Sequence, residues 1–152
     1  MDEILIAKLL VLPGVKTSRD ELSSLTSAIP WTPIWLLDLM EKYPLASCSF
    51  SIEDTDDMSG LGVEMQWLSA DGIIDEATNA YPGIAAARHQ YIPIGVCLVG
   101  TGDPYFIRAE AQPSMVYRIP HSAVREDELN IDGIECVAPS LLEFLEVALR
   151  TR

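Results

Sequence analysis

The residues best suited to bind an ion or a charged partner are four acidic side chains that lie close together in the sequence. They are Glu53, Asp54, Asp56 and Asp57. Calcium binds carboxylate-rich loops, but a calcium loop beginning at Asp54 requires an oxygen ligand at Met58, a glycine at Ser59 and a glutamate at Met65. The spacing therefore predicts a solvated acidic loop rather than a metal site. A loop of this charge favours a basic partner.

A second group combines glycines with an acidic residue. It consists of Gly100, Gly102, Asp103 and Pro104. Glycines can let backbone amides approach a phosphate group. However, no Gly-Lys-Ser/Thr sequence follows, the third glycine of a dinucleotide-binding motif is missing, and Asp103 would repel phosphate. The pattern therefore predicts a structural turn between two strands.

Histidine, cysteine and serine form no catalytic or metal-binding motif. His89 and His121 lack the spacing of a zinc-binding pair, and no serine lies in a Gly-x-Ser-x-Gly sequence. Cys48, Cys97 and Cys136 are far apart and odd in number, which favours free thiols and a cytoplasmic location. We therefore predict a protein that is not an enzyme and that binds no metal or cofactor.

Composition narrows the classes of partner. The 152 residues include 10 Lys and Arg against 23 Asp and Glu, giving a net charge of −13, and 49% of them are hydrophobic. Such a surface repels nucleic acid and anionic lipid, whereas a basic protein remains a suitable partner. The apolar segment 4–12 follows two acidic residues and contains Lys8, so it predicts neither a secretory signal nor a membrane span.

The elements that must position these groups indicate one α+β domain over residues 1–152. Helices are expected in the first 43 residues: over 4–12, after Ser18 up to Pro30, and after Thr32 as the capping residue. Two further helices are expected, one after Ser69 and one after Ser140.

Alternating apolar residues predict strands between these helices. The expected strands are 48–52, 63–67, 91–99, 105–107, 116–120 and 131–137, with a turn at Tyr81-Pro82-Gly83. The predicted fold is therefore a mixed, mostly antiparallel sheet that helices from both ends of the sequence cover. Trp31, Trp35 and Trp67 are expected in the core, although an exposed tryptophan would be a natural interface anchor.

Several short motifs occur in an order that resembles the SUKH superfamily, which groups the Smi/Knr cell-wall regulators of fungi with bacterial immunity proteins. The resemblance covers about residues 20–148. It rests on Ile29-Pro30 with Trp35 and Leu39, Trp67-Leu68, Ile92-Pro93-Ile94-Gly95, the segments 97–107 and 116–119, His121, and Ser140-Leu141 with Phe144-Leu145. Tyr43-Pro44 stands where many members carry Asn-Gly. The resemblance implies an α+β domain without catalytic machinery.

For bacterial members the resemblance implies neutralisation of a polymorphic toxin by stoichiometric binding. Together with the charge, it predicts a cytoplasmic immunity protein for a basic, nuclease-type toxin domain, with Glu53, Asp54, Asp56 and Asp57 facing the partner. One alternative is a regulatory scaffold like the fungal relatives. Another is a small hydrolase that uses His121 with Asp103 or a nearby serine.

Overall fold

A computed structural model describes residues 1–100 and 102–152. In this part of the chain the α-helices are α1 (Glu3–Leu10), α2 (Arg19–Ala28), α3 (Ile34–Lys42), α4 (Ala70–Asn79), α5 (Gly83–Ala87) and α6 (Leu141–Ala148). The main sheet contains β1 (Ser49–Ile52), β2 (Val63–Trp67), β3 (Tyr91–Cys97), β4 (Tyr105–Arg108), β5 (Val116–Arg118) and β8 (Glu135–Ala138). A small separate hairpin is formed by β6 (Val124–Arg125) and β7 (Glu128–Leu129).

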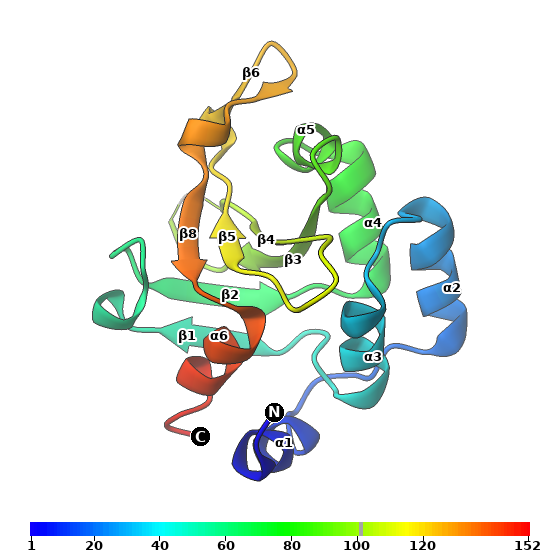
Figure 1. Cartoon of the computed structure of the whole chain (residues 1–152), viewed down its shortest axis with the longest axis vertical. Helices are drawn as coiled ribbons and strands as arrows, with labels where there is room; N and C mark the ends of the chain where they lie inside the picture. The colour runs from blue at the N-terminus through cyan, green and yellow to red at the C-terminus, as the bar shows by residue number, and fades with distance from the viewer. Residues whose placement is uncertain (101) are drawn as a thin grey trace.

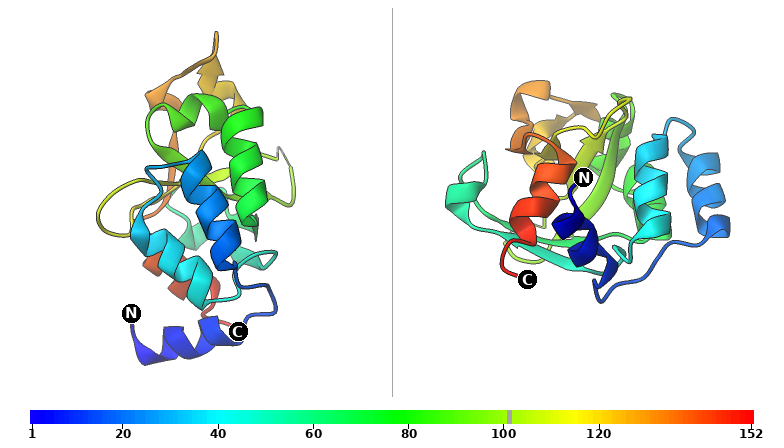
Figure 2. Two further views of the ribbon diagram at one scale, coloured as in Figure 1. Left: turned by 90° about the vertical axis from the view of Figure 1, so that its right-hand side faces the viewer. Right: turned by 60° about the horizontal axis from the view of Figure 1, so that its bottom comes forward.

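The strands of the main sheet are arranged in the order β1-β2-β3-β4-β5-β8, and every described pair is antiparallel. The sheet is curled, with α6 and α1 side by side at one end, α4 packed against β3, and α2 on the outer side of α3 and α4 (Figures 1 and 2). Lys8 links α1 to the end of α6, because its Nζ donates to the carbonyl oxygen of Leu149 at 2.7 Å. The predicted α+β fold is confirmed, and the expected parallel component is absent from the described strands.

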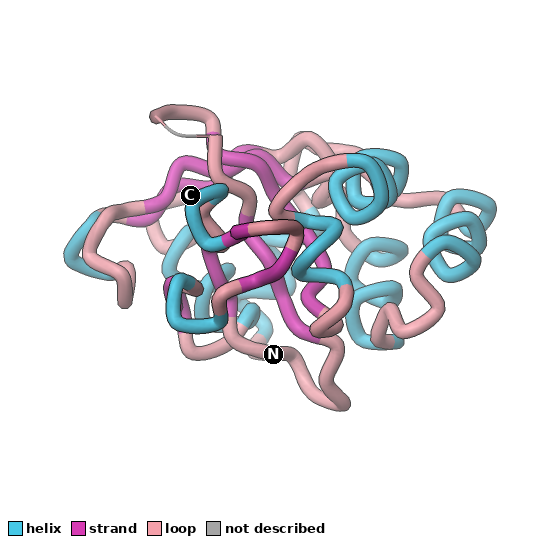
Figure 3. The backbone as a smooth tube through the Cα atoms, turned by 90° about the horizontal axis from the view of Figure 1, so that it is seen from above, coloured by secondary structure: helices cyan, strands magenta, loops and turns pink. Residues whose placement is uncertain are grey.

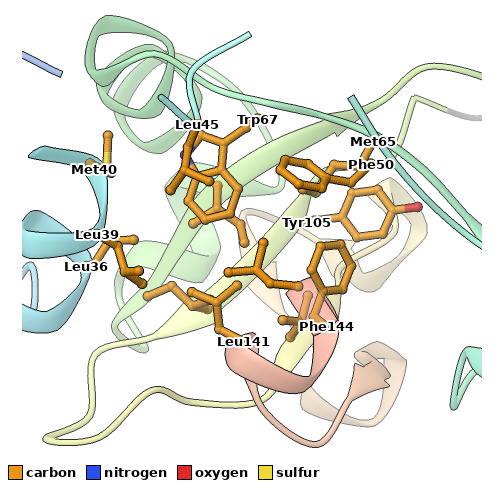
Figure 4. Packing of buried hydrophobic residues seen from close by; sticks show 14 of the residues in the cluster. Leu36, Leu39, Met40, Leu45, Phe50, Met65, Trp67, Tyr105, Leu141 and Phe144 are labelled. Carbon is orange, nitrogen blue, oxygen red and sulfur yellow. The ribbon is translucent and has the colours of Figure 1, made fainter. Parts of the chain in front are cut away.

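The core forms because apolar positions alternate along the strands. Phe50 and Ile52 on β1 are buried while the two serines of that strand are exposed. Figure 4 shows side chains from α3, β1, β2, β4 and α6 meeting on one face of the sheet, where Phe50 contacts Trp67 and Phe144 with ring centroids 6.2 and 6.3 Å apart. A smaller cluster of Tyr91, Phe106, Ile119 and residues of α5 forms a second hydrophobic core.

Serine caps begin three helices as the sequence predicts. The hydroxyls of Ser18, Ser69 and Ser140 accept hydrogen bonds from backbone amides three residues later. The prediction that Thr32 caps α3 is wrong. Its hydroxyl donates to the carbonyl of Ile29 at 2.7 Å, and Pro33 occupies the cap position of α3.

Other predicted boundaries also change. Residues 83–87 form helix α5 immediately after the expected turn, and the strand expected over 131–137 is a 3₁₀ turn at Ile131–Gly133 followed by β8. The strands expected over 91–99 and 116–120 end earlier, at Cys97 and Arg118. Trp67 is buried as expected, but Trp31 lies exposed at the surface. Among the described residues, no helix has the length and apolar character needed to cross a bilayer.

Candidate functional site

A cleft of about 840 Å³ lies at the end of the sheet where the loops after β1 and β3 emerge. Both loops extend from the same side of the sheet in Figure 3. Residues from all six main strands, the segment that follows β5 and the end of α6 complete its walls. The cleft therefore brings together two groups that the sequence analysis selected separately, the acidic loop and the glycine turn.

The walls of the cleft carry more acidic than basic side chains. Its acidic lining residues are Glu53, Asp54, Asp56, Glu64, Asp103 and Glu135. Arg118 and Arg150 also line it, and each is paired with an acidic residue: Arg118 with Glu135 at 3.0 Å and Arg150 with Asp56 at 3.7 Å. Because both cations are already neutralised, the cleft presents a negative surface.

Three of the four residues that the sequence predicts to face a partner are exposed at the surface. Glu53, Asp54 and Asp56 are exposed on a 3₁₀ turn at Asp54–Asp56 that follows β1. This turn keeps the three carboxylates outside the core and at the wall of the cleft.

Asp57 differs from the prediction because its side chain is 0% exposed. Its carboxylate accepts hydrogen bonds from the amide of Ser59 at 2.8 Å and the hydroxyl of Ser59 at 2.7 Å. It also lies 3.5 Å from a terminal nitrogen of Arg118. Asp57 is therefore a buried structural residue whose carboxylate no partner can reach in this conformation.

Arg118 is a buried residue that donates hydrogen bonds to several groups around the cleft. Its side chain is 7% exposed and donates to the carbonyl of Gly62 at 2.7 Å, the hydroxyl of Ser59 at 2.8 Å and the hydroxyl of Tyr105 at 3.2 Å. Burial alone would lower the pKa of Arg118, but the hydrogen bonds that it donates to Tyr105 and Glu135 and the charge of Asp57 raise it overall. The guanidinium is therefore charged throughout the accessible pH range.

Tyr105 remains a neutral hydrogen-bonding partner of this cation. Burial raises the pKa of the Tyr105 phenol, while the hydrogen bond and charge of Arg118 act in the opposite direction. The guanidinium carbon also lies 5.1 Å from the centre of the tyrosine ring, within the range of a cation–π contact. Tyr105 therefore contacts Arg118 through both its ring and its hydroxyl.

Gly100 and Gly102 lie in the segment for which the sequence predicts a structural turn. Gly100 and Gly102 have φ values of 67° and 70°, a region that glycine adopts without strain, and the segment joins the antiparallel strands β3 and β4. Thr101, between them, lies outside the described residues. Asp103 and Pro104 are buried, and the Asp103 carboxylate accepts a hydrogen bond from the amide of His121 at 3.1 Å.

The structure also pairs the two residues of the hydrolase alternative. His121 Nδ1 lies 2.6 Å from Asp103 Oδ1. Covalent hydrolysis additionally requires a hydroxyl or thiol beside the other ring nitrogen, and the hydrogen bonds described for the ring and the amide of His121 go to Asp103. Cys97, in the cleft wall, instead has its Sγ 2.6 Å from the carbonyl oxygen of Val99. The described residues also contain no cluster of three metal-binding side chains.

Exposed aliphatic side chains accompany the acidic groups. Leu61 is 67% exposed and Val99 is 60% exposed, and both line the cleft. Met58 and Leu98 are exposed on the same two loops. Leu61 and Val99 therefore add exposed apolar surface to the wall of the acidic cleft.

Sequence reasoning missed Arg118, although the sequence contains a signal for it. Val116 and Arg118 alternate with Tyr117, so an inward-facing Val116 places Arg118 on the same buried face of β5. A charged residue at such a position requires buried partners. The signal does not identify those partners, because Asp57 lies 61 residues away in the sequence.

No protein-family model matches this sequence, and no curated protein matches it.

Proposed function

We propose that this protein is a non-enzymatic binding protein that neutralises a basic protein by covering part of its surface. The observation that carries the proposal is the cleft, in which exposed carboxylates lie beside exposed aliphatic side chains. The order of SUKH-like motifs supports a more specific form of it, an immunity protein for a nuclease-type toxin domain.

The charge and the aliphatic groups favour the same kind of occupant. Carboxylates attract lysine and arginine side chains, and the net charge of −13 accelerates association with a basic protein at low salt. Leu61 and Val99 offer contact surface for the methylene groups of those side chains and for neighbouring apolar residues. A polyanion such as nucleic acid meets repulsion at the same surface.

Neutralisation by occlusion follows from this arrangement without chemistry in the binding protein. An enzyme that cleaves nucleic acid needs a basic surface where the phosphate backbone lies. An acidic protein bound to that surface excludes the substrate by charge and by volume. We therefore expect a one-to-one complex whose formation, rather than turnover, accounts for protection.

A growth assay tests the proposal directly. The carboxy-terminal domain of whatever secreted protein is encoded beside this gene is expressed with and without the full chain. Rescue of growth together with a one-to-one complex supports the proposal. A toxic domain that kills despite the chain, or a harmless domain, contradicts the immunity function for that pair. Stable capture of several host proteins and of no toxin instead supports the alternative, a regulatory scaffold.

A charge-neutralising variant tests whether the cleft is the binding surface. The variant Glu53→Gln, Asp54→Asn and Asp56→Asn removes three exposed negative charges from its wall. We expect association at low salt to slow about tenfold and its salt dependence to weaken. The matched control removes three exposed charges elsewhere, Asp20→Asn, Glu126→Gln and Glu128→Gln. Equal slowing in both variants would show that overall charge, and not the cleft, governs binding.

The His121–Asp103 pair makes a hydrolase the second candidate. A panel of carboxylic esters and phosphoesters tests it. Hydrolysis that the native protein performs and that His121→Ala abolishes would support this candidate. We expect no turnover, and protection in the growth assay should survive the same substitution.

A further inference from the structure

The acidic segment between β1 and β2 is held against the sheet by contacts with Arg118 of β5. Residues 53–62 contain no strand, yet Arg118 of β5 contacts this segment at three points. Its guanidinium donates to the hydroxyl of Ser59 at 2.8 Å and to the carbonyl of Gly62 at 2.7 Å, and it lies 3.5 Å from the Asp57 carboxylate. The amide of Met58 adds a link to β8 by donating to the carbonyl of Val137 at 2.9 Å.

The guanidinium is itself held in place from the sheet side. Tyr105 of β4 accepts from one terminal nitrogen at 3.2 Å, and Glu135 of β8 accepts from the other at 3.0 Å. Arg118 thus joins two fixed strands to one loop. Its side chain is 7% exposed, so water does not compete freely for these hydrogen bonds.

We propose that Arg118 is a positioning residue that holds the segment 53–62 in its binding shape before a partner arrives, an inference that rests on the proposed function of the cleft. Drawing Asp57 inward leaves the neighbouring Asp54 and Asp56 on the outer side of the turn. A segment already ordered in the free protein loses less conformational entropy on binding, which strengthens the complex.

The geometry requires arginine rather than lysine. A guanidinium offers five donors in a planar fork, and here two terminal nitrogens reach five acceptor groups. A lysine ammonium has three donors at one point, so it can retain the charge but cannot bridge the strands and the loop at once. Arg118→Lys therefore separates the bridging role from the charge.

Hydrogen–deuterium exchange of the full chain tests the fastening directly. In Arg118→Lys we expect amides of Met58, Ser59 and Gly60, which are hydrogen-bonded in the structure, to exchange at least tenfold faster. Amides of the central strand β4 should not change. Arg108→Lys is the matched control, because Arg108 also stacks on a tyrosine, Tyr91, at 5.5 Å, but is exposed and donates to the carbonyl of His89, outside the segment. Asp57→Asn provides a second variant that loosens the same segment if Arg118→Lys does not fold.

Binding of a synthetic peptide of alternating lysine and leucine tests the consequence. We expect its affinity for Arg118→Lys to fall about fivefold, while Arg108→Lys binds like the native protein. Unchanged exchange in residues 53–62 would overturn the proposal. So would faster exchange with native affinity, provided that neutralising Glu53, Asp54 and Asp56 still weakens binding. If that neutralisation leaves peptide binding unchanged, the proposed function of the cleft fails instead, and the positioning role for binding fails with it.

Discussion

Removal of Arg118 should destabilise the protein mainly by leaving Asp57 buried without its cation. The Asp57 side chain is 0% exposed and lies 3.5 Å from the guanidinium. At that separation an effective dielectric constant of 20 gives an attraction of about 5 kcal/mol. Breaking a buried pair by removing one partner costs about 3–5 kcal/mol, because the remaining charge stays desolvated. Glu135, whose side chain is 33% exposed, adds at most about 1 kcal/mol. We expect Arg118→Met to lower the free energy of unfolding by about 3–5 kcal/mol.

A double-mutant cycle isolates the contribution of the pair. Asp57→Asn alone leaves Arg118 bonded to Tyr105, Gly62 and Glu135, so it should cost only about 1–2 kcal/mol. The double variant Arg118→Met, Asp57→Asn buries no charge at either position. It should therefore be more stable than the sum of the single effects by at least about 2 kcal/mol.

Urea unfolding, monitored by circular dichroism and tryptophan fluorescence, measures the free energy of unfolding of the native protein and the three variants. If Arg118→Met is too unstable to fold, the cycle is run in trimethylamine N-oxide, which stabilises all members. Additive effects, within about 0.5 kcal/mol, would refute the buried pair as an energetic unit.

Three other substitutions, one of them with a matched control, test separate features. Gly83→Ala should destabilise by about 3 kcal/mol or more in thermal unfolding, because a Cβ there would overlap the backbone of Glu76, whereas Gly72→Ala meets only flexible or small side chains and should be neutral or stabilising. Gly102→Ala should cost about 1–2 kcal/mol from its positive φ, although open space surrounds it; no loss would contradict the described turn. Burial and the charge of Asp75 raise the pKa of Glu76 above 4.5, whereas the charge of His121 opposes the shift. The folded state therefore favours the protonated acid, and the stability that comes from this preference is lost as the pH rises. Glu76→Gln should therefore raise the melting temperature at pH 7–8 and have little effect below about pH 4, and an equal effect at both would contradict this account.

Local signals predicted much of the fold because they depend on neighbours in sequence. Serine caps, alternating strands and the turn at Gly100 and Gly102 each follow from a few adjacent residues. Helix α5 was missed because its five residues give no periodicity, and its position depends on close packing against α4 at Gly83.

The candidate site was predictable only in part. The charge run correctly indicated an exposed acidic wall, but its four members look equivalent in the sequence. Only the long-range contact with Arg118 separates Asp57 from Asp56, and no local pattern encodes a contact across 61 residues. The sequence also did not predict that Glu64 and Glu135 line the cleft, because it is the curl of the sheet that brings them toward the loop.

Under the proposed function, a division of labour within the acidic segment lets one loop serve both stability and binding. Buried ion pairs contribute little net stability compared with well-packed apolar groups, because desolvation offsets their attraction. What Arg118 and Asp57 supply is a specific orientation: one acidic residue turns inward against a fixed cation, and Glu53, Asp54 and Asp56 remain at the surface. Neutralising the exposed residues should then change association with a basic protein while leaving the free energy of unfolding nearly unchanged, or slightly raised through reduced self-repulsion. Neutralising Asp57 should do the opposite and disturb the fold first, so substitutions at adjacent positions separate the two roles.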